Sequence, residues 1–252
     1  MNLASQQVHL YFSQPGKITD PDLLQRYATL LTDDERAQMS RFYFAGHRHQ
    51  YLLTRALIRS CLSAYYPVEP ADWRFAKNDY GKPQVRHPHS GVSARFNLSH
   101  TNGLIVCAIT ADVDIGVDVE DADRTTRAAF ESLSSYFSAQ EIKDLVALPA
   151  ERKKQRFFDY WTLKESYIKA RGMGLAIPLG KFSFHFKGDQ LKEFRVHPEL
   201  GDDAQNWRFW RIAMTERYPV AVAVNAAGRD FEISAFDTVP LLSSDPLELI
   251  FK

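Results

Sequence analysis

The stretch Trp161-Thr162-Leu163-Lys164-Glu165-Ser166-Tyr167-Ile168-Lys169 combines one carboxylate and two ammonium groups with the apolar pattern of a buried helix. Positions four apart stack on nearly the same face of an α-helix, so Trp161, Glu165 and Lys169 form one stripe. Taken alone, Glu165 and Lys169 read as a solvated ion pair of small energetic value. The surrounding aromatic and aliphatic residues leave little of this helix free to face water. The stretch therefore predicts a partly buried charged site, with Trp161 as the packing anchor that orients the helix.

A second run, Ile115-Gly116-Val117-Asp118-Val119-Glu120, has the alternation of a β-strand. Side chains alternate between the two faces of a strand, so Asp118 and Glu120 share one face. A polar face in water is the default interpretation, but Gly116 permits close backbone approach beside the acids. Clustered carboxylates repel one another unless a cation joins them, and hard oxygen ligands suit Mg²⁺. Together with Glu165 and the two lysines, these acids are the parts needed to hold a metal-bound phosphate ester.

Composition restricts the class of protein. The chain has 252 residues, 45% hydrophobic and 25% charged, which is enough to bury one large core or two small ones. A formal net charge of zero argues against a general nucleic-acid or membrane-surface binder. Cys61 and Cys107 lie in apolar surroundings and are expected to be core residues. No window approaches a membrane span and the N-terminus lacks a signal-peptide pattern, so we expect a cytoplasmic protein.

Periodicity and turn signals outline the elements. They predict strands at 7–13, 73–75, 104–110, 115–120, 182–186, 207–213 and 219–225, and helices at 46–65, 125–147 and 152–171. Further helices are expected to begin after Asp20 and after Thr32, which has capping-box spacing to Glu35. Gly172 is expected to stop the last helix.

The order long helix, strand, apolar strand occurs twice along the chain. This repetition predicts an α+β fold of two similar α/β halves that meet face to face; the family resemblance given below implies that they form a pseudo-two-fold monomer. We expect an N-terminal half at 1–110 and a C-terminal half at 111–252 that carries the acids.

Other polar positions are open to two interpretations. Ser99-His100 lies at a turn whose backbone N–H groups could meet a phosphate, although a lone histidine is more often a structural hydrogen-bonder. Gly81-Lys82-Pro83 is a tight turn with one cation. Arg41, Arg48 and Arg55 have a seven-residue spacing and share one helical face, which is either solvated or binds an anion.

Four blocks occur in a fixed order along the chain. They are Tyr80-Gly81-Lys82-Pro83, Phe96-Asn97-Leu98-Ser99-His100, the run 115–120, and Phe137-Ser138-Ala139-Gln140-Glu141 followed by 161–169. This ordered set resembles the 4′-phosphopantetheinyl transferases, specifically the long monomeric type that activates surfactin synthetase. The resemblance covers about residues 40 to 186. Each block is weak alone, but the ordered set is highly specific.

The resemblance implies a magnesium-dependent transfer of 4′-phosphopantetheine from coenzyme A to a serine of an apo acyl or peptidyl carrier protein, with release of adenosine 3′,5′-bisphosphate. It implies a monomer. Asp118, Glu120 and Glu165 match the metal-binding acids. Glu165 is our candidate base, and Lys169 matches a lysine near the transferred phosphate; with Asp118 these are the expected catalytic residues.

The resemblance also assigns coenzyme A contacts. Lys82, Ser99, His100 and Lys164, with Lys169, match positions near its phosphates, whereas Glu141 matches a characteristic acid without a firm role. One departure concerns the nucleotide 3′-phosphate, which some members of the family hold with lysines where this chain has Glu35 and Gln38. We therefore expect Arg48 and Arg55 to bind the 3′-phosphate of coenzyme A.

Two other functions remain open from the residues. A magnesium-dependent nucleotide diphosphate hydrolase would also use an acid cluster. A non-catalytic module that binds coenzyme A or a carrier protein would be expected to have lost Asp118, Glu165 or Lys169, and all three are present. The region 121–140 is where we expect carrier recognition, and fatty-acid, polyketide and peptide-synthetase carriers are all open.

Overall fold

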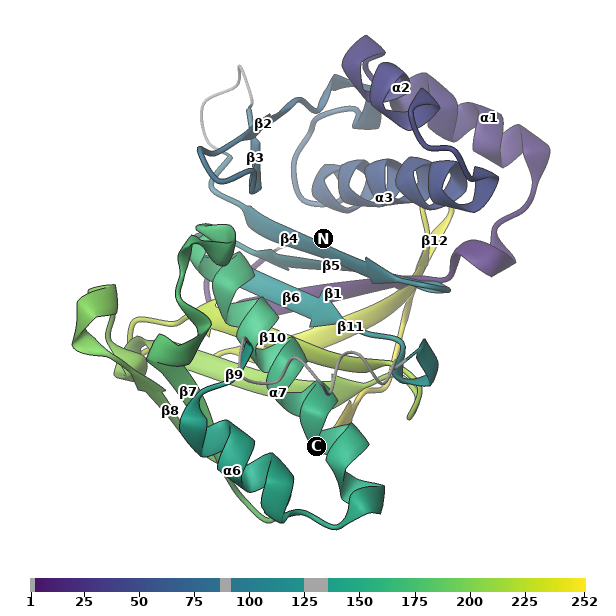
Figure 1. The fold of residues 1–252 in the computed structure, drawn as a ribbon. Helices are drawn as coiled ribbons and strands as arrows, with labels where there is room; N and C mark the ends of the chain where they lie inside the picture. The colour runs from purple at the N-terminus through teal and green to yellow at the C-terminus, as the bar shows by residue number, and fades with distance from the viewer. Residues whose placement is uncertain (1–2, 87–91, 125–135) are drawn as a thin grey trace.

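The computed structural model describes residues 3–86, 92–124 and 136–252. Two sheets lie face to face, with helices on their outer sides (Figure 1). The first sheet has the strand order β12-β11-β1-β5-β4, and the second has the order β13-β9-β10-β6. Their bounds are β1 Gln7–Ser13, β4 Arg95–Thr101, β5 Leu104–Thr110, β6 Ile115–Val119, β9 Trp207–Ala213, β10 Pro219–Asn225, β11 Glu232–Val239, β12 Ser243–Pro246 and β13 Ile250–Phe251.

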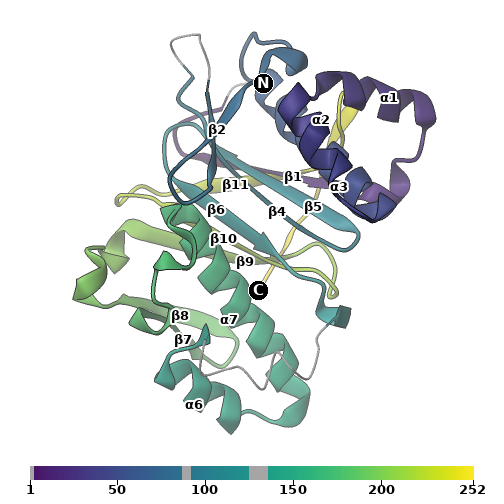
Figure 2. The same ribbon diagram turned by 45° about the horizontal axis from the view of Figure 1, so that its top comes forward.

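Helices and hairpins cover the two sheets. The helices are α1 Pro21–Leu30, α2 Asp33–Ser40, α3 Ala45–Ser63, α6 Ala139–Ala147 and α7 Ala150–Arg171. The hairpins are β2 Phe75–Lys77 with β3 Pro83–Val85, and β7 Phe182–Lys187 with β8 Gln190–Val196. α1 to α3 lie on the first sheet, and α7 lies on the second (Figures 1 and 2).

Local signals in the sequence set the element ends as expected. The Thr32 side chain accepts from the Glu35 N–H, and the Glu35 carboxylate accepts from the Thr32 N–H, which confirms the capping box. Gly172 ends α7 in the left-handed region, with φ 65°. The predicted strand at 73–75 lies two residues later, and β3, β4, β8 and β11 to β13 were not predicted. Ser99 and His100, expected at a turn, instead lie within β4 and pair with Val106 and Ile105 of β5. The first part of the predicted helix 125–147 falls outside the described residues.

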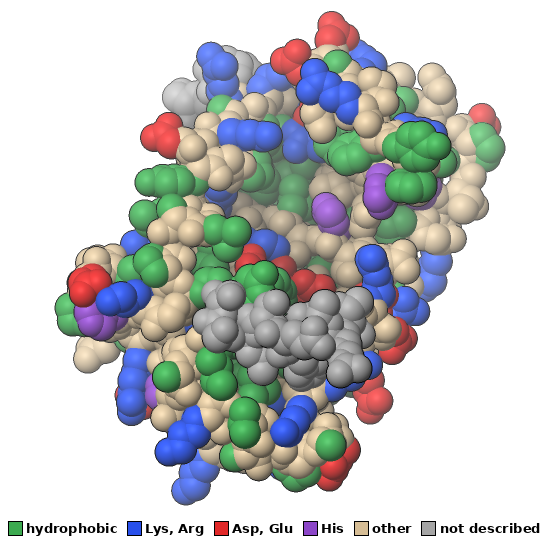
Figure 3. Space-filling view, viewed as in Figure 1, with side chains coloured by type: hydrophobic (Ala, Val, Ile, Leu, Met, Phe, Trp, Pro, Cys, Tyr) green, Lys and Arg blue, Asp and Glu red, His purple; other side chains and the backbone are tan. Residues whose placement is uncertain are grey.

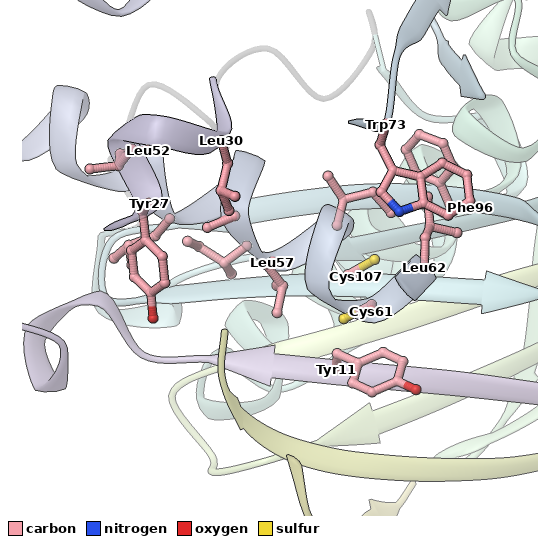
Figure 4. Packing of buried hydrophobic residues seen from close by; sticks show 14 of the residues in the cluster. Tyr11, Tyr27, Leu30, Leu52, Leu57, Cys61, Leu62, Trp73, Phe96 and Cys107 are labelled. Carbon is pink, nitrogen blue, oxygen red and sulfur yellow. The ribbon is translucent and has the colours of Figure 1, made fainter. Parts of the chain in front are cut away.

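Strand alternation divides the apolar residues into three layers. Residues from β1, β5, β6 and β10 on one face form the core between the sheets. The opposite faces of β1, β4 and β5 pack against α1 to α3, where Leu57 and Cys61 of α3 lie over Cys107 of β5 (Figure 4). Aromatic residues of α7, β7 and β8 form the third layer on the outer face of β10. Cys61 and Cys107 are buried free thiols, as expected.

Helix α7 approaches its sheet very closely. A Cβ atom at Gly116 would lie 2.0 Å from the Ser166 carbonyl oxygen and 2.4 Å from the Ala170 nitrogen. Gly116 pairs with Ala223 in the neighbouring strand β10, so the platform beneath the helix consists of small residues. The close backbone approach expected at Gly116 is therefore present, and it brings the acids of β6 within reach of α7.

The two sheets meet along their edges at β4 and β6. The Asn97 side-chain oxygen accepts from the Val117 N–H at 2.9 Å, and Ser99 Oγ accepts from the Val119 N–H at 3.3 Å. Side chains of β4 thus satisfy backbone donors of an edge strand that would otherwise be open for pairing. This seam holds the first half of the chain against the strand that carries Asp118.

The end of the chain returns to the first half. β11 pairs in parallel with β1, with Leu10 opposite Ala235, and β12 extends the same sheet. The sheet of the N-terminal half is therefore completed by residues beyond 231, so it is not built from 1–110 alone. The division at 110 stays a prediction about domains. Among the described residues, no helix is long and apolar enough to cross a lipid bilayer.

Candidate active site

The stripe on α7 faces the acids of β6. Lys169 Nζ lies 2.6 Å from Asp118 Oδ1, and Trp161 Nε1 donates to Glu120 Oε1 at 2.9 Å. The strand therefore runs antiparallel to the helix, and the two contacts lie on either side of Glu165 along the helix. The structure brings together Asp118, Glu120, Glu165 and Lys169, which were predicted from separate segments.

Asp118 is buried, with 4% of its surface exposed. Its Oδ1 accepts from Ser99 Oγ at 3.0 Å as well as from Lys169. Its Oδ2 is also buried but has no hydrogen-bond partner among the described residues. Buried polar atoms are nearly always bonded, and an unsatisfied carboxylate oxygen is costly. The geometry thus leaves one oxygen of Asp118 for a ligand.

The electrostatics of the cluster favour a cation. Burial, reinforced by the charge of Asp118, raises the pKa of Glu120 to about 7, against the opposing effects of Trp161 and Lys169. Burial and Asp118 also raise the pKa of Glu165, while Lys169 lowers it. Among the residues that the structure describes, three carboxylates share the charge of one lysine, which is an excess of negative charge that a divalent cation would neutralise.

The donor set fits Mg²⁺ bound together with a phosphate. Within the described ranges, no three Asp, Glu, His or Cys side chains converge as a finished metal cage. Mg²⁺ usually takes one or two carboxylates and fills its remaining positions with phosphate oxygens and water, so a finished cage is not required. Asp118 Oδ2, which has no partner among the residues described, and the carboxylate oxygens of Glu120 and Glu165 fit this description.

Ser99 and His100 are neighbours in β4, but the first is buried and the second reaches solvent. Ser99 is buried and accepts from Lys169 Nζ at 2.9 Å, so it belongs to the Asp118 network. The His100 side chain reaches solvent, yet the surrounding protein lowers its pKa, and Lys169 and His47 of α3 lower it further. Figure 3 shows a hollow between the two halves, with acidic side chains in it and histidines above it. His47 was not singled out from the sequence.

Lys82 ties the β2–β3 hairpin to the end of the site. Its Nζ donates to the Ala170 carbonyl at 2.8 Å and to the Ile115 carbonyl at 3.2 Å. Burial lowers the pKa of Lys82 to about 8, although Asp114 opposes this effect. Lys82 therefore bridges the end of α7 and the start of β6, and it does not contact the carboxylates through these bonds.

The placement of Lys164 requires a correction. It is 2% exposed, and its Nζ donates to the Leu179 and Phe182 carbonyls, each at 2.8 Å. The same Nζ lies 2.9 Å from Glu141 Oε2. An ammonium has three protons, and all three are used inside the protein. The structure thus places Lys164 away from the cluster, in contrast to the expected phosphate contact.

Glu141, for which the sequence predicted no firm role, makes structural contacts. Its carboxylate accepts from the Ser138 N–H at 2.8 Å, which caps α6, and from the Phe184 N–H at 3.0 Å. With Lys164 it joins α6, α7 and β7 in a fully buried network. The acid is satisfied by the protein itself.

Arg48 and Arg55 do not join the carboxylate cluster. Arg48 donates to the Phe42 and Tyr43 carbonyls at 2.7 and 2.9 Å, which holds the loop before α3. Arg55 pairs with Glu35, which also accepts from the buried Arg59 at 2.6 Å. Glu35, which stands where some members of the family have a lysine, is therefore neutralised by two arginines of α3.

Two polar side chains were underestimated from sequence. From the sequence, Asn97 has no assigned role and Trp161 is predicted to be a packing anchor. In the structure Asn97 accepts a hydrogen bond at the β4–β6 seam, and Trp161 donates one to Glu120. The signal for Asn97 was available, because Asn97 and Ser99 alternate with Phe96 and Leu98 and therefore share one face of the strand.

Comparisons with known proteins agree with this geometry. Residues 114–223 match the family model described as the 4′-phosphopantetheinyl transferase superfamily, and residues 19–112 match the model of a 4′-phosphopantetheinyl transferase N-terminal region. The 4′-phosphopantetheinyl transferase HetI of Nostoc sp. is 38% identical over 237 residues, covering 90% of this chain and 92% of HetI. The 4′-phosphopantetheinyl transferase Sfp of Bacillus subtilis is 33% identical over 207 residues, covering 82% and 87%.

Both halves of the chain are thus matched, and the matched regions include every residue of the carboxylate cluster and its seam. The α+β fold of two halves, expected from the sequence, is confirmed. The chain belongs to the 4′-phosphopantetheinyl transferase superfamily and is a 4′-phosphopantetheinyl transferase.

Proposed function

We propose that this transferase moves 4′-phosphopantetheine from coenzyme A to a serine of an apo acyl or peptidyl carrier protein, in a reaction that depends on Mg²⁺ and releases adenosine 3′,5′-bisphosphate. One observation carries the proposal: the buried Asp118 has an Oδ2 without a partner in the described part of the chain, beside two further carboxylates and a lysine. We also propose that the protein acts as a monomer in the cytoplasm.

Asp118, Glu120 and Glu165 are the residues that would hold the metal. When bound, Mg²⁺ neutralises the diphosphate and stabilises charge on the leaving oxygen. The contribution of the chain is to keep these acids at one place, through the Ser99 and Lys169 contacts to Asp118.

Glu165 is the proposed base for the carrier serine. Burial and the charge of Asp118 raise its pKa, which makes it a stronger proton acceptor than an exposed glutamate. The serine oxygen forms a bond to the phosphorus attached to pantetheine, its proton passes to Glu165, and the bond from that phosphorus to the bridging oxygen of the diphosphate breaks.

Lys169 is the proposed contact of the leaving phosphate. Its Nζ uses two donors, to Asp118 and Ser99, and an ammonium has three. The remaining donor is available to stabilise the negative charge on the released bisphosphate.

The rest of coenzyme A would lie along the hollow between the halves. We propose that His100 of β4 and Lys82 of the β2–β3 hairpin contact its phosphates. We propose that Arg48 and Arg55 contribute positive charge for the 3′-phosphate. Because Arg55 already shares its charge with Glu35, Arg48 is expected to contribute more.

The test is direct. The protein is mixed with coenzyme A, Mg²⁺ and an apo carrier protein, and the carrier is weighed by mass spectrometry. The expected result is the gain of one phosphopantetheine group, lost in Asp118→Ala and in Glu165→Ala. Cleavage of coenzyme A with no change in the carrier would instead support the hydrolase. No gain with fatty-acid, polyketide and peptide-synthetase carriers would contradict the proposal.

A further inference from the structure

Trp161 makes a contact that packing does not require. Its indole Nε1 donates to Glu120 Oε1 at 2.9 Å. A buried or half-buried tryptophan usually finds an acceptor for this N–H, and a backbone carbonyl or hydroxyl would serve equally well. Here the acceptor is a carboxylate of the cluster, on a strand that is distant in sequence.

The orientation of the indole is fixed by its neighbours. The Trp161 ring stacks on Phe157, with centroids 6.2 Å apart and planes at 10°, and meets Tyr136 edge-on at 5.1 Å. Trp161 lies one helical turn before Glu165, so the same helix sets the position of both. The N–H direction toward Glu120 is thus determined by an aromatic frame.

Asp118 of β6 and Glu120, which follows the last residue of β6, are held in the same manner. Asp118 accepts protein donors on Oδ1, from Ser99 and Lys169, and its Oδ2 has no partner among the described residues. Glu120 accepts the indole donor on Oε1. In each carboxylate a protein donor fixes one oxygen, which determines the direction of the other.

The spacing explains why two separate donors are needed. Trp161 and Lys169 are eight positions apart, about 12 Å along a helix, whereas Asp118 and Glu120 are two positions apart, about 7 Å along a strand. The contacts therefore converge from the helix toward the strand, with Glu165 between them. Without a donor at Trp161, Glu120 would be free to turn away from the like charge of Asp118.

We propose that Trp161 is a positioning residue that holds Glu120 for metal binding through its indole N–H. This inference rests on the proposed magnesium site. Donors that orient metal ligands typically affect metal affinity by 10–100-fold, so loss of this donor should weaken the metal site measurably.

The test measures metal binding without turnover. Mn²⁺ is titrated into the protein with coenzyme A present and carrier absent, and free Mn²⁺ is measured by electron paramagnetic resonance. Trp161→Phe keeps an aromatic ring and removes the donor. The matched control is Trp207→Phe, because Trp207 Nε1 donates to Asp202 Oδ2 at 3.0 Å, outside the cluster.

We expect Trp161→Phe to raise the Mn²⁺ Kd about tenfold, and Trp207→Phe to leave it within twofold. Replacing Trp161 with 3-benzothienylalanine, which keeps the fused ring but has no N–H, should reproduce the Trp161→Phe effect. Turnover of Trp161→Phe should recover toward wild type as Mn²⁺ is increased. Thermal unfolding of each variant establishes that the protein compared is folded.

An unchanged Mn²⁺ Kd in the folded Trp161→Phe and benzothienylalanine proteins would overturn the inference. Asp118→Ala separates this failure from failure of the metal site itself. If Asp118→Ala weakens Mn²⁺ binding while the Trp161 variants do not, the site stands and the role of Trp161 is wrong. If Asp118→Ala has no effect either, the proposed site is wrong as well.

Discussion

Two long helices, α3 and α7, each lie on a sheet and each bring acids and basic side chains together, yet the charges are balanced differently. Beside α3, the single carboxylate of Glu35 accepts from both Arg55 and Arg59. Beside α7, Asp118, Glu120 and Glu165 share Lys169, and one carboxylate oxygen has no partner among the described residues. In the first cluster two arginines share one carboxylate, both of whose oxygens are bonded, although Arg59 Nε has no partner among the described residues; in the second cluster the carboxylates outnumber the lysine.

This difference separates structural from functional charge. A buried ion pair that satisfies its own hydrogen bonds holds elements together, as Glu141 and Lys164 also do. A cluster with excess charge and an open oxygen is stable only because the surrounding fold holds it, and it is ready for a ligand that supplies the missing charge. The following variants test this separation.

The largest effects should distinguish Lys164 from Asp118. Lys164→Met leaves the buried Glu141 without its cation and is expected to lower the free energy of unfolding by about 3–5 kcal/mol. Asp118→Asn keeps the acceptor for Ser99 and Lys169, so it should change stability little but reduce transfer at least about a hundredfold. Urea unfolding and carrier mass spectrometry measure the two effects. Loss of transfer without loss of stability in Lys164→Met would reverse our placement of that residue.

Gly116→Ala tests the close approach of α7 to β6. The added methyl would meet backbone atoms of the helix at 2.0 and 2.4 Å, and backbone cannot move aside as a flexible side chain can. We expect a loss of about 1–3 kcal/mol in urea unfolding, with transfer impaired as the helix shifts. Gly46→Ala on α3 is the control, since its Cβ would meet nothing within 4 Å. Equal effects of the two substitutions would show that the contact is not tight.

Glu35→Gln tests the cluster beside α3. The substitution leaves the buried Arg59 without an ionised acceptor, and we expect a loss of about 1–3 kcal/mol at neutral pH with little change in kcat. Burial alone would raise the pKa of Glu35, but Arg55 and Arg59 outweigh it and lower that pKa. The contribution of Glu35 is therefore present above the usual glutamate pKa and is lost as pH falls through the lowered value.

The control for Glu35 is Asp33→Asn, because Asp33 pairs with Arg36 at the surface and should contribute almost nothing. A stability difference between wild type and Glu35→Gln that persists undiminished at strongly acidic pH would contradict the ionic explanation.

The smallest effect should come from Glu120→Gln, which is expected to raise the free energy of unfolding where the other substitutions lower it. Burial and Asp118 raise the pKa of Glu120 to about 7, so the ionised form is disfavoured in the folded protein. In EDTA at pH 8 we expect Glu120→Gln to be more stable than wild type by less than about 1 kcal/mol, since Glu120 is partly exposed. The difference should vanish below about pH 4.5, where Glu120 is protonated in both states. Thermal unfolding across pH measures it, and a variant less stable than wild type at pH 8 would contradict the repulsion.

Most elements near the site could be predicted from local patterns. The alternation in 115–119 correctly put Asp118 on the face opposite Val117, and the spacing in 161–169 correctly put Glu165 and Lys169 on one stripe. The capping box at Thr32 and the stop at Gly172 were also visible, because caps and left-handed turns depend on a few adjacent residues.

The partners of polar side chains could not be predicted in this manner. Lys164 and Lys169 are similar in sequence context, but one points into the α6–α7–β7 core and the other toward Asp118. A helix presents several faces, and which face meets which neighbour depends on how distant segments pack. The extra strands β11 and β12 were not predicted, and β11 joins a sheet begun more than 200 residues earlier, so its place depends on a distant partner that local patterns do not show.

The sequence by itself determined the element types, the faces that carry acids and lysines, and the ordered blocks that identify the family, because these depend on periodicity and local order. Only the tertiary structure decided which groups meet. The side chains of the segment 161–169 have three different roles: Lys164 pairs with Glu141 inside the protein, Glu165 and Lys169 face the acids, and Trp161 holds Glu120. The physical reason is that the role of a charged side chain depends on the group it contacts, and here those groups lie on segments that are distant in the sequence.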